Sequence, residues 1–471
     1  MDFDYLVVPH THWDREWYVP FEVFRLRLGA VVDEVLDVLE RDTSFTSFTL
    51  DGQAIVLEDY VELRPEQEER LRALLAVGRL EAGPSYVLPD ELLVGGESLV
   101  RNLLLGRRVC RRFGAEPSSA GYHPDSFGHP AQLPQVLAGF GIETFLFSRG
   151  LGDEIDDVGV LFRWRAGDAE VVACQMLPHY DNFARLVDAE DAAQRVEGIV
   201  ESFGGLLPER STIVLANGSD HLPIQPQLPR ICETLGPSFR IGRFSEHRPA
   251  GGGLPAHEGE LVGSRLQNVL RGVNSARMYL KQANEAAERR VLAVETVAAL
   301  RTLRDATAFP SSNMRLAWRD LLRNHPHDSI CGCSCDEVHR DMLVRYERLG
   351  RTLEILELDA LGVGGALVNP LPYRRRREGV ELDGFEGRRV ERSNDATPLE
   401  TLDISFEDEP DVGDLYTFCP GGPVRAAKLV TSRSVGGELH LEHELPGIRI
   451  VTVARCAGDR IELQTTVEND A

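Results

Sequence analysis

Short apolar runs alternate with longer amphipathic stretches along the first half of the chain. One amphipathic stretch, 27–40, gathers its valines and leucines on a single helical face. A second helix is predicted over 65–80, where a proline opens the stretch and glutamates follow. Alternation of this kind is typical of the α/β class. Strands are expected at 3–9, 45–51, 119–123, 143–148, 170–175, 212–216 and 238–244.

The pattern changes after the glycine run at 251–253. Long helical segments are predicted at 275–307, 312–323 and 336–361, and they indicate a helical domain. These segments lack the short apolar runs of the first half. A separate unit is therefore expected to follow the α/β region.

From Ala366 onward the chain is rich in short β-type runs. Turn signals separate them at Asn369-Pro370, Pro420-Gly421-Gly422 and Gly436-Gly437. This pattern predicts the start of a β-sandwich, whose last strand, 461–467, is followed closely by the end of the chain. We expect an α/β domain over 1–250, a helical domain over 251–362 and a β-rich, incomplete domain over 363–471.

Composition agrees with several packed domains. The chain has 471 residues, of which 42% are hydrophobic and 27% charged, which is unlike a disordered or fibrous protein. Its 75 acidic and 51 basic residues give a net charge of −24, so polyphosphate is repelled and nucleic acid is excluded as a partner. Only Lys281 and Lys428 are lysines. This balance indicates either adaptation to high salt or codon bias with ordinary acidity.

The location expected from the sequence is cytoplasmic, without membrane attachment. Stretches of about 18 uninterrupted apolar residues, the length that spans a membrane, do not occur. Asp2 and Asp4 stand where a secretion signal would carry positive charge.

Cysteine usage does not predict a disulfide scaffold, since 471 residues contain 8 cysteines. The run Cys331-Gly-Cys333-Ser-Cys335 lacks the two-residue gap and the second pair of a zinc knuckle. Reduced or structural thiols are therefore favoured there over a cysteine metal site.

Polar residues follow several predicted strands at the point where each strand ends. In parallel α/β folds this carboxyl edge is where active sites form. A further group follows a predicted helix of the second region. The groups are His10-Thr-His12-Trp-Asp14, Asp125, Arg149, Asp220 and His325-Pro-His327-Asp328.

His12 and Asp14 are two residues apart, so both side chains leave the same face of an extended segment. Imidazole and carboxylate together favour Zn2+ or another borderline divalent ion. The alternative is a loop histidine beside a helix-capping aspartate. Asp125 and Asp220 form a candidate carboxylate pair for acetal hydrolysis, and the alternative for each is a turn-forming aspartate.

Ordered stretches of the chain resemble the glycoside hydrolase family 38 α-mannosidases. The first, which also resembles bacterial mannosylglycerate hydrolases, is Val7-Val-Pro-His-Thr-His-Trp-Asp-Arg-Glu-Trp-Tyr18. The second is Gly121-Tyr-His-Pro-Asp125-Ser-Phe-Gly-His-Pro-Ala-Gln-Leu-Pro134. The others are Phe147-Ser-Arg149-Gly, Asn217-Gly-Ser-Asp220-His and Asn324-His-Pro-His327-Asp328-Ser. The resemblance covers residues 3–365 approximately.

The resemblance implies a fold and a mechanism. The fold would be an incomplete (β/α)7-type barrel followed by a helical bundle domain and a β-sandwich. The activity would be that of a retaining, zinc-dependent α-mannosidase with a covalent mannosyl-enzyme intermediate. One Zn2+ per chain would be held by His12, Asp14, Asp125 and His327. Asp125 would also be the nucleophile, and Asp220 would be the general acid and base.

The same resemblance implies substrate-binding residues. Trp17 and Phe127 match the aromatic platform for the sugar ring, and core packing is the alternative for each. Arg149 and Asp328 match positions that bind sugar hydroxyls or hold the nucleophile. Structural roles are expected for His10, Trp13 and His123.

Two other functions compete with the α-mannosidase. One is a metal-dependent carbohydrate deacetylase, which would use a metal-bound water and no carboxylate nucleophile. The other is a non-catalytic sugar-binding remnant, against which the intact Asp125 and Asp220 argue. The expected partner is an α-mannoside or a small mannosylated substrate. An oligomer or a separately encoded C-terminal chain is also possible, because family members generally continue through larger β-domains.

Overall fold

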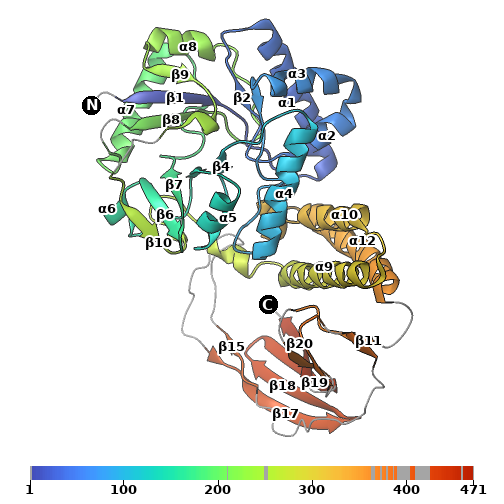
Figure 1. Cartoon of the computed structure of the whole chain (residues 1–471). Helices are drawn as coiled ribbons and strands as arrows, with labels where there is room; N and C mark the ends of the chain where they lie inside the picture. The colour runs from blue at the N-terminus through green and yellow to red at the C-terminus, as the bar shows by residue number, and fades with distance from the viewer. Residues whose placement is uncertain are drawn as a thin grey trace. The chain divides into compact units, whose positions relative to one another are not determined.

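The computed structural model of the chain divides into two compact units (Figure 1). The first comprises 1–288 and 316–349, and the second comprises 289–315 and 350–471. The structure describes residues 3–208, 211–248, 253–361, 366–371, 374–377, 380–385, 387–389, 404–408, 425–457 and 460–469. Within these residues, no helix is both long enough and apolar enough to cross a membrane.

Strands of the first unit are mostly parallel. One sheet has the order β8-β1-β9, and a larger one has the order β10-β6-β7-β5-β4, in which only the β6–β7 pairing is antiparallel. β2 and β3 pair in parallel beside them. The strands are β1 (Asp4–Pro9), β2 (Phe48–Thr49), β3 (Leu80–Glu81), β4 (Ala120–His123), β5 (Thr144–Phe147), β6 (Leu161–Ala166), β7 (Ala169–Gln175), β8 (Thr212–Asn217), β9 (Phe239–Ile241) and β10 (Ala256–Glu258).

The predicted mixed α/β class is confirmed, because every expected strand overlaps an observed one and helices lie between them. β1 shows why the strands are recognisable in the sequence. Leu6, Val7 and Val8 are all fully buried, as in a parallel strand that is covered on both faces. Strands β3, β6 and β10 were not expected, and β6 forms a hairpin with β7 through Gly167 at φ +58°.

Helices cover the strands of the first unit, and Figure 1 shows α7 and α8 beside the β8-β1-β9 sheet. They are α1 (Phe21–Arg41), α2 (Ile55–Leu63), α3 (Glu68–Ala76), α4 (Gly96–Arg112), α5 (Leu133–Gly139), α6 (Ile155–Val158), α7 (Ala189–Phe203) and α8 (Leu228–Leu235).

Two helix boundaries differ from the sequence prediction. α1 begins directly after Pro20 rather than at Arg27, and its buried stripe starts at Phe24. The helix predicted over 65–80 ends at Ala76, because Gly78 adopts φ +70° and the chain then enters β3.

Past their strands, β1 and β8 continue as adjacent segments, and this arrangement positions the site. His10 N donates to Asn217 O at 3.2 Å, and His12 N donates to Ser219 O at 3.2 Å. The segments approach so closely that a Cβ at Gly218 would lie 1.9 Å from His10 O. Asp220 is therefore held beside His12 by main-chain contacts.

The long helices expected after the glycine run are present. α9 (Met278–Asp305), α10 (Ser311–Leu322) and α12 (Asp336–Leu361) overlap the predicted segments, and the short α11 (His327–Ile330) lies between the last two. In the first unit, Tyr346 Oη donates to Asn284 Oδ1 at 3.2 Å. In the second, Arg290 pairs with Glu357 at 3.3 Å. Both contacts join α9 to α12.

The second unit ends in an antiparallel sheet. β17 (Lys428–Val435), β18 (Glu438–Leu445), β19 (Ile448–Ala457) and β20 (Arg460–Asn469) pair in that order. Gly436 and Gly437 form the β17–β18 turn with positive φ angles, as the turn signal predicted. The signal at 420–422 lies outside the described residues. Shorter pairs precede this sheet: β11 (Ala366–Val368) with β14 (Gly387–Arg389), β12 (Arg375–Arg377) with β13 (Val380–Leu382), and β15 (Glu407–Asp408) with β16 (Arg425–Ala426).

A buried ion pair fastens α12 to the loop after β1. The fully buried Glu16 pairs with Arg345, which donates from Nη1 to Glu16 Oε1 at 2.8 Å. Arg345 also donates to Arg323 O at 2.8 Å, and Ser329 Oγ donates to Glu16 Oε1 at 2.8 Å. One arginine thus connects three segments of the first unit.

We predict that Arg345→Met lowers the free energy of unfolding of the first unit by about 3–5 kcal/mol, because Glu16 would be left buried without its partner. Arg340→Met is the matched control on the same helix. Its partner Glu337 is 56% exposed, so a loss below about 1 kcal/mol is expected. All 4 tryptophans lie in the first unit, so urea denaturation followed by tryptophan fluorescence reports on it. Equal losses in the two variants would contradict the prediction.

Candidate active site

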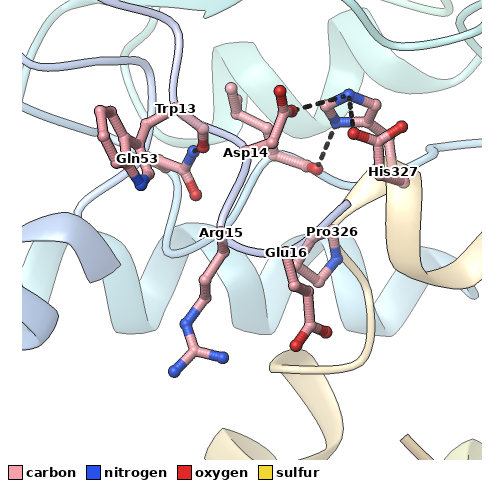
Figure 2. A pocket seen from close by; sticks show the side chains of 9 residues that line it. Trp13, Asp14, Arg15, Glu16, Gln53, Pro326 and His327 are labelled. Atoms are coloured by element: carbon pink, nitrogen blue, oxygen red, sulfur yellow. Dashed lines mark hydrogen bonds and ion pairs between the residues drawn. The ribbon is translucent and has the colours of Figure 1, made fainter. Parts of the chain in front are cut away.

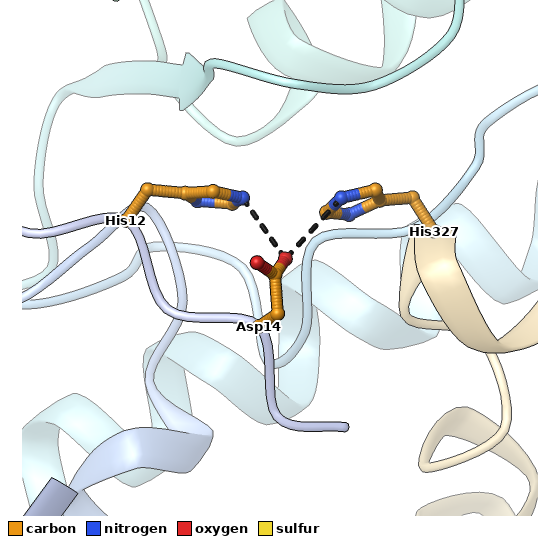
Figure 3. A group of neighbouring side chains, drawn as sticks. All are labelled: His12, Asp14 and His327. Atoms are coloured by element: carbon orange, nitrogen blue, oxygen red, sulfur yellow. Dashed lines mark ion pairs between the residues drawn. The ribbon is translucent and has the colours of Figure 1, made fainter. Parts of the chain in front are cut away.

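Two imidazoles and one carboxylate converge beyond the end of β1 and at the start of α11. His12 Nε2 lies 3.1 Å from Asp14 Oδ1, and His327 Nε2 lies 3.4 Å from the same oxygen (Figure 3). At least 96% of each side chain is buried. The segment after β1 supplies His12 and Asp14, and the first residue of α11 supplies His327. The structure thus brings together these residues from distant parts of the sequence.

This group has the properties of a metal site. His12 Nε2, Asp14 Oδ1 and His327 Nε2 are buried and make no hydrogen bond, although buried polar atoms normally do. Ligand atoms of the three residues lie within 4.8 Å of one another. Imidazole nitrogen and carboxylate oxygen suit a borderline divalent ion. These residues could therefore hold a metal ion.

Asp51 lies beside the other ring nitrogen of His12. His12 Nδ1 lies 3.2 Å from Asp51 Oδ2, which also accepts from Trp13 N and from Gln53 Nε2, each at 2.9 Å. A carboxylate behind a histidine ligand fixes the ring and its tautomer. Sequence reasoning missed Asp51, which lies at the end of an expected strand, where other polar residues were singled out.

Asp125 follows β4 and contacts both the group and an arginine. Its Oδ2 lies 3.5 Å from His327 Nε2, and its Oδ1 accepts from Arg149 Nε at 2.8 Å. Burial acts to raise the pKa of Asp125, but the Arg149 guanidinium and His327 outweigh it and hold that pKa well below its usual range. The carboxylate is therefore ionised at neutral pH.

Asp220 follows β8 and has a different environment. Burial raises the pKa of Asp220, and the nearby carboxylates of Asp14 and Asp125 add to the rise, while His12 opposes it. Tyr180 Oη donates to Asp220 Oδ1 at 2.6 Å. Burial and these carboxylates raise the pKa of Tyr180 well above its usual value, so its hydroxyl remains a donor. The pKa values of Asp125 and Asp220 are thus shifted in opposite directions.

The remaining predicted residues lie at different distances from this group. The Phe127 ring meets the His327 ring edge-on at 5.4 Å, and the Arg149 guanidinium lies 5.9 Å from the Phe127 ring centre. Asp328 is buried with Oδ2 3.8 Å from His327 Nε2. Trp17 is partly exposed and meets the ring of Tyr18 at 5.0 Å.

A small pocket opens beside the group (Figure 2). Asp14, His327 and Asp328 line it together with Arg15, Glu16 and Gln53. Trp13, Leu88 and Pro326 complete the lining, so the pocket has both polar and apolar walls.

Glu91 fixes the segment that carries Asp125. Its carboxylate pairs with His123 through one oxygen and with His129 Nδ1 at 3.0 Å through the other. His123 Nε2 in turn lies 3.2 Å from Ser85 Oγ. These contacts agree with the structural role expected for His123. Glu91 carries no signal in the sequence, because it sits in a segment without strand or helix.

The chain matches two known domains. Residues 2–222 match the glycosyl hydrolases family 38 N-terminal domain, and residues 268–362 match the alpha mannosidase middle domain. The first match contains His12, Asp14, Asp125 and Asp220, and the second contains His327.

Similar proteins carry corresponding names. "Putative mannosylglycerate hydrolase" of Halalkalibacterium halodurans is 36% identical over 74% of this chain and 42% of its own length. "Alpha-mannosidase 2C1" of Mus musculus is 25% identical over 78% of this chain and 36% of its own length. The chain thus spans about two fifths of the curated relatives it matches.

A solved structure supports the fold. The crystal structure of an alpha-mannosidase from Enterococcus faecalis V583 matches with a TM-score of 0.82 at 23% identity, over 100% of this chain and 74% of that one. The resemblance noted in the sequence is confirmed: through its N-terminal and middle domains, this chain belongs to glycosyl hydrolase family 38.

Proposed function

We propose that this chain is a zinc-dependent α-mannosidase that hydrolyses terminal α-mannosides with retention of configuration. The observation that carries the proposal is the placement of Asp125 between Arg149 and His327, next to the His12–Asp14–His327 group. The opposite pKa shifts of Asp125 and Asp220 add to it, because retaining glycosidases need one ionised and one protonated carboxyl group.

The proposed zinc ligands are His12, Asp14, Asp125 and His327, with one ion per chain. Support comes from the orphaned nitrogen and oxygen atoms of His12, Asp14 and His327. When bound, the ion would supply Lewis-acid stabilisation to sugar oxygens at the reacting ring. Asp51 would keep the His12 ring in the orientation that presents Nε2.

Asp125 and Asp220 would share the covalent chemistry. An oxygen of Asp125 forms a bond to the anomeric carbon as the bond from that carbon to the leaving oxygen breaks, and Asp220 gives its proton to that oxygen. Asp220 then removes a proton from water, whose oxygen displaces Asp125 from the sugar. Two inversions at one carbon return the original configuration.

Other residues would bind the sugar or hold the nucleophile. We assign Trp17 and Phe127 to the faces of the ring and Asp328 to sugar hydroxyls. Arg149 pairs with Asp125 through Oδ1, so its role would be to keep the other oxygen directed at the anomeric carbon. A small mannoside of the mannosylglycerate type is the proposed substrate, following the relative that is 36% identical.

The architecture proposed for this activity is an incomplete (β/α)7-type barrel over 1–250. The parallel pairing of β8 with β1, of β4 with β5 and of β5 with β7 supports it. The helical domain over 251–362 would complete the metal site through His327, ahead of the β-rich domain over 363–471.

We predict that His12→Ala and His327→Ala each lose the zinc and the activity, because each removes one imidazole ligand from a four-ligand site. Metal content would be measured on the purified chain by mass spectrometry. His257→Ala, on β10, is the matched histidine control and should keep about one ion per chain. Stoichiometric zinc in both site variants would overturn the ligand assignment.

Asp51→Asn should weaken zinc binding by about 10- to 100-fold without removing a ligand, because it disturbs only the orientation of His12. Competition with a chelator measures this affinity. An unchanged affinity would mean that Asp51 does not orient the metal ligand.

Asp220→Ala should slow hydrolysis of an alkyl mannoside by about 10²- to 10⁴-fold but affect p-nitrophenyl mannoside much less, because an activated leaving group needs no proton. Asp125→Ala should be inactive on both substrates, since it removes the nucleophile. Asp168→Ala, an exposed aspartate in the β6–β7 turn, is the control. Equal losses on the two substrates for Asp220→Ala would place the acid elsewhere. Acetate release from an acetylated sugar, with no mannoside hydrolysis, would contradict the proposed function itself.

A further inference from the structure

A second cluster of metal-binding side chains lies next to the first but uses different residues. Asp328, Cys331 and Cys333 each offer a ligand atom, and these atoms lie within 4.8 Å of one another. Cys333 Sγ is 3.1 Å from Asp328 Oδ1 and 3.1 Å from Cys331 Sγ. Asp328 and Cys331 are buried, whereas Cys333 is partly exposed. The cluster is therefore compact and accessible from one side.

The main chain around the thiols is held in place. Gly332 adopts φ +86°, a conformation that L side chains rarely take, and this turn brings the two sulfur atoms together. Lys281 Nζ donates to Cys331 O at 2.6 Å, and Arg277 Nε donates to Gly332 O at 3.0 Å. Ser334 Oγ donates to Asp328 O at 2.8 Å. The three ligand atoms thus need little rearrangement to meet a common ion.

The chemistry of this cluster differs from that of the first. Thiolate sulfur selects soft cations such as Cd2+ and Cu+, whereas the His12–Asp14–His327 group contains no sulfur. In the sequence, Cys331 and Cys333 lack the second cysteine pair of a zinc knuckle. In the structure, the Asp328 carboxylate lies beside Cys333 and offers a third ligand atom that the cysteine spacing alone does not reveal.

We propose that Asp328, Cys331 and Cys333 form a second metal site that takes a thiophilic d¹⁰ cation. On binding, each thiol passes its proton to solvent and its sulfur joins the ion as a thiolate. Three protein ligands leave a four-coordinate ion one position for solvent.

An ion bound at this site would also inhibit mannoside hydrolysis. Asp328 is assigned above to sugar hydroxyls, and a carboxylate engaged with an ion cannot accept from them. This consequence rests on the proposed function, whereas the metal binding does not.

The test is a Cd2+ titration of the full chain, loaded with zinc and kept reduced by a phosphine. The absorbance band of cadmium bound to thiolate should rise to saturation at one added ion per chain, and Cd2+ at the sulfur-free first group gives no such band. The double variant Cys331→Ser/Cys333→Ser should lose the band and weaken Cd2+ binding at least about 100-fold. This loss exceeds the one expected from changing a residue that only contacts a metal ligand. Cys335→Ser is the matched control and should titrate like the parent.

Two results would overturn the site: no thiolate band in the parent chain, or a band that persists in Cys331→Ser/Cys333→Ser. Cys333→Ser alone, at the partly exposed position, keeps the test valid if the double variant unfolds, and it should also lose most of the band. With a mannoside as substrate, Cd2+ should inhibit the parent and Cys335→Ser but not Cys333→Ser. If no variant hydrolyses mannosides, the proposed function fails while the absorbance titration still decides the metal site.

Discussion

Buried charge at the carboxyl ends of β1, β4 and β8 is the constraint on which the first unit depends. His12, Asp14 and His327 leave polar atoms without hydrogen bonds, and such atoms are costly inside a protein. The surrounding chain compensates with opposite charges: Arg149 faces Asp125, and Arg345 faces Glu16. The first pair joins the segments after β4 and β5, and the second joins α12 to the loop after β1.

Arginine suits these positions better than lysine. Arg15 donates to both oxygens of Asp59, at 2.8 and 3.1 Å, and Arg345 binds Glu16 while also reaching two other acceptors. A planar guanidinium can satisfy several buried acceptors at once, which an ammonium cannot do as well. The scarcity of lysine in this acidic chain therefore matches the way its buried carboxylates are neutralised.

Much of the fold is readable from the sequence because its signals are local. The apolar run around Val7 and the valine stripe of α1 report burial directly. Hairpin strand β6 was missed because it is defined by its partner β7, and α3 ends early because Gly78 takes a positive φ. Candidate site residues at strand ends were found in the same local way. Glu91 and Tyr180 were not found, since their roles come from contacts across 38 to 40 residues of sequence, which periodicity does not encode. Asp51 was missed although it ends an expected strand.

The adjacent segments beyond β1 and β8 have a consequence for how the site can vary. Ser219 and His221 both bond to the backbone of His12, so Asp220, which lies between them, takes its position from main-chain hydrogen bonds. Gly218 permits this approach because any side chain there would collide with His10. The distance from Asp220 to the histidine group is thereby a property of the backbone. Substitutions at the site can therefore change the chemistry of its side chains without changing the backbone spacing between them.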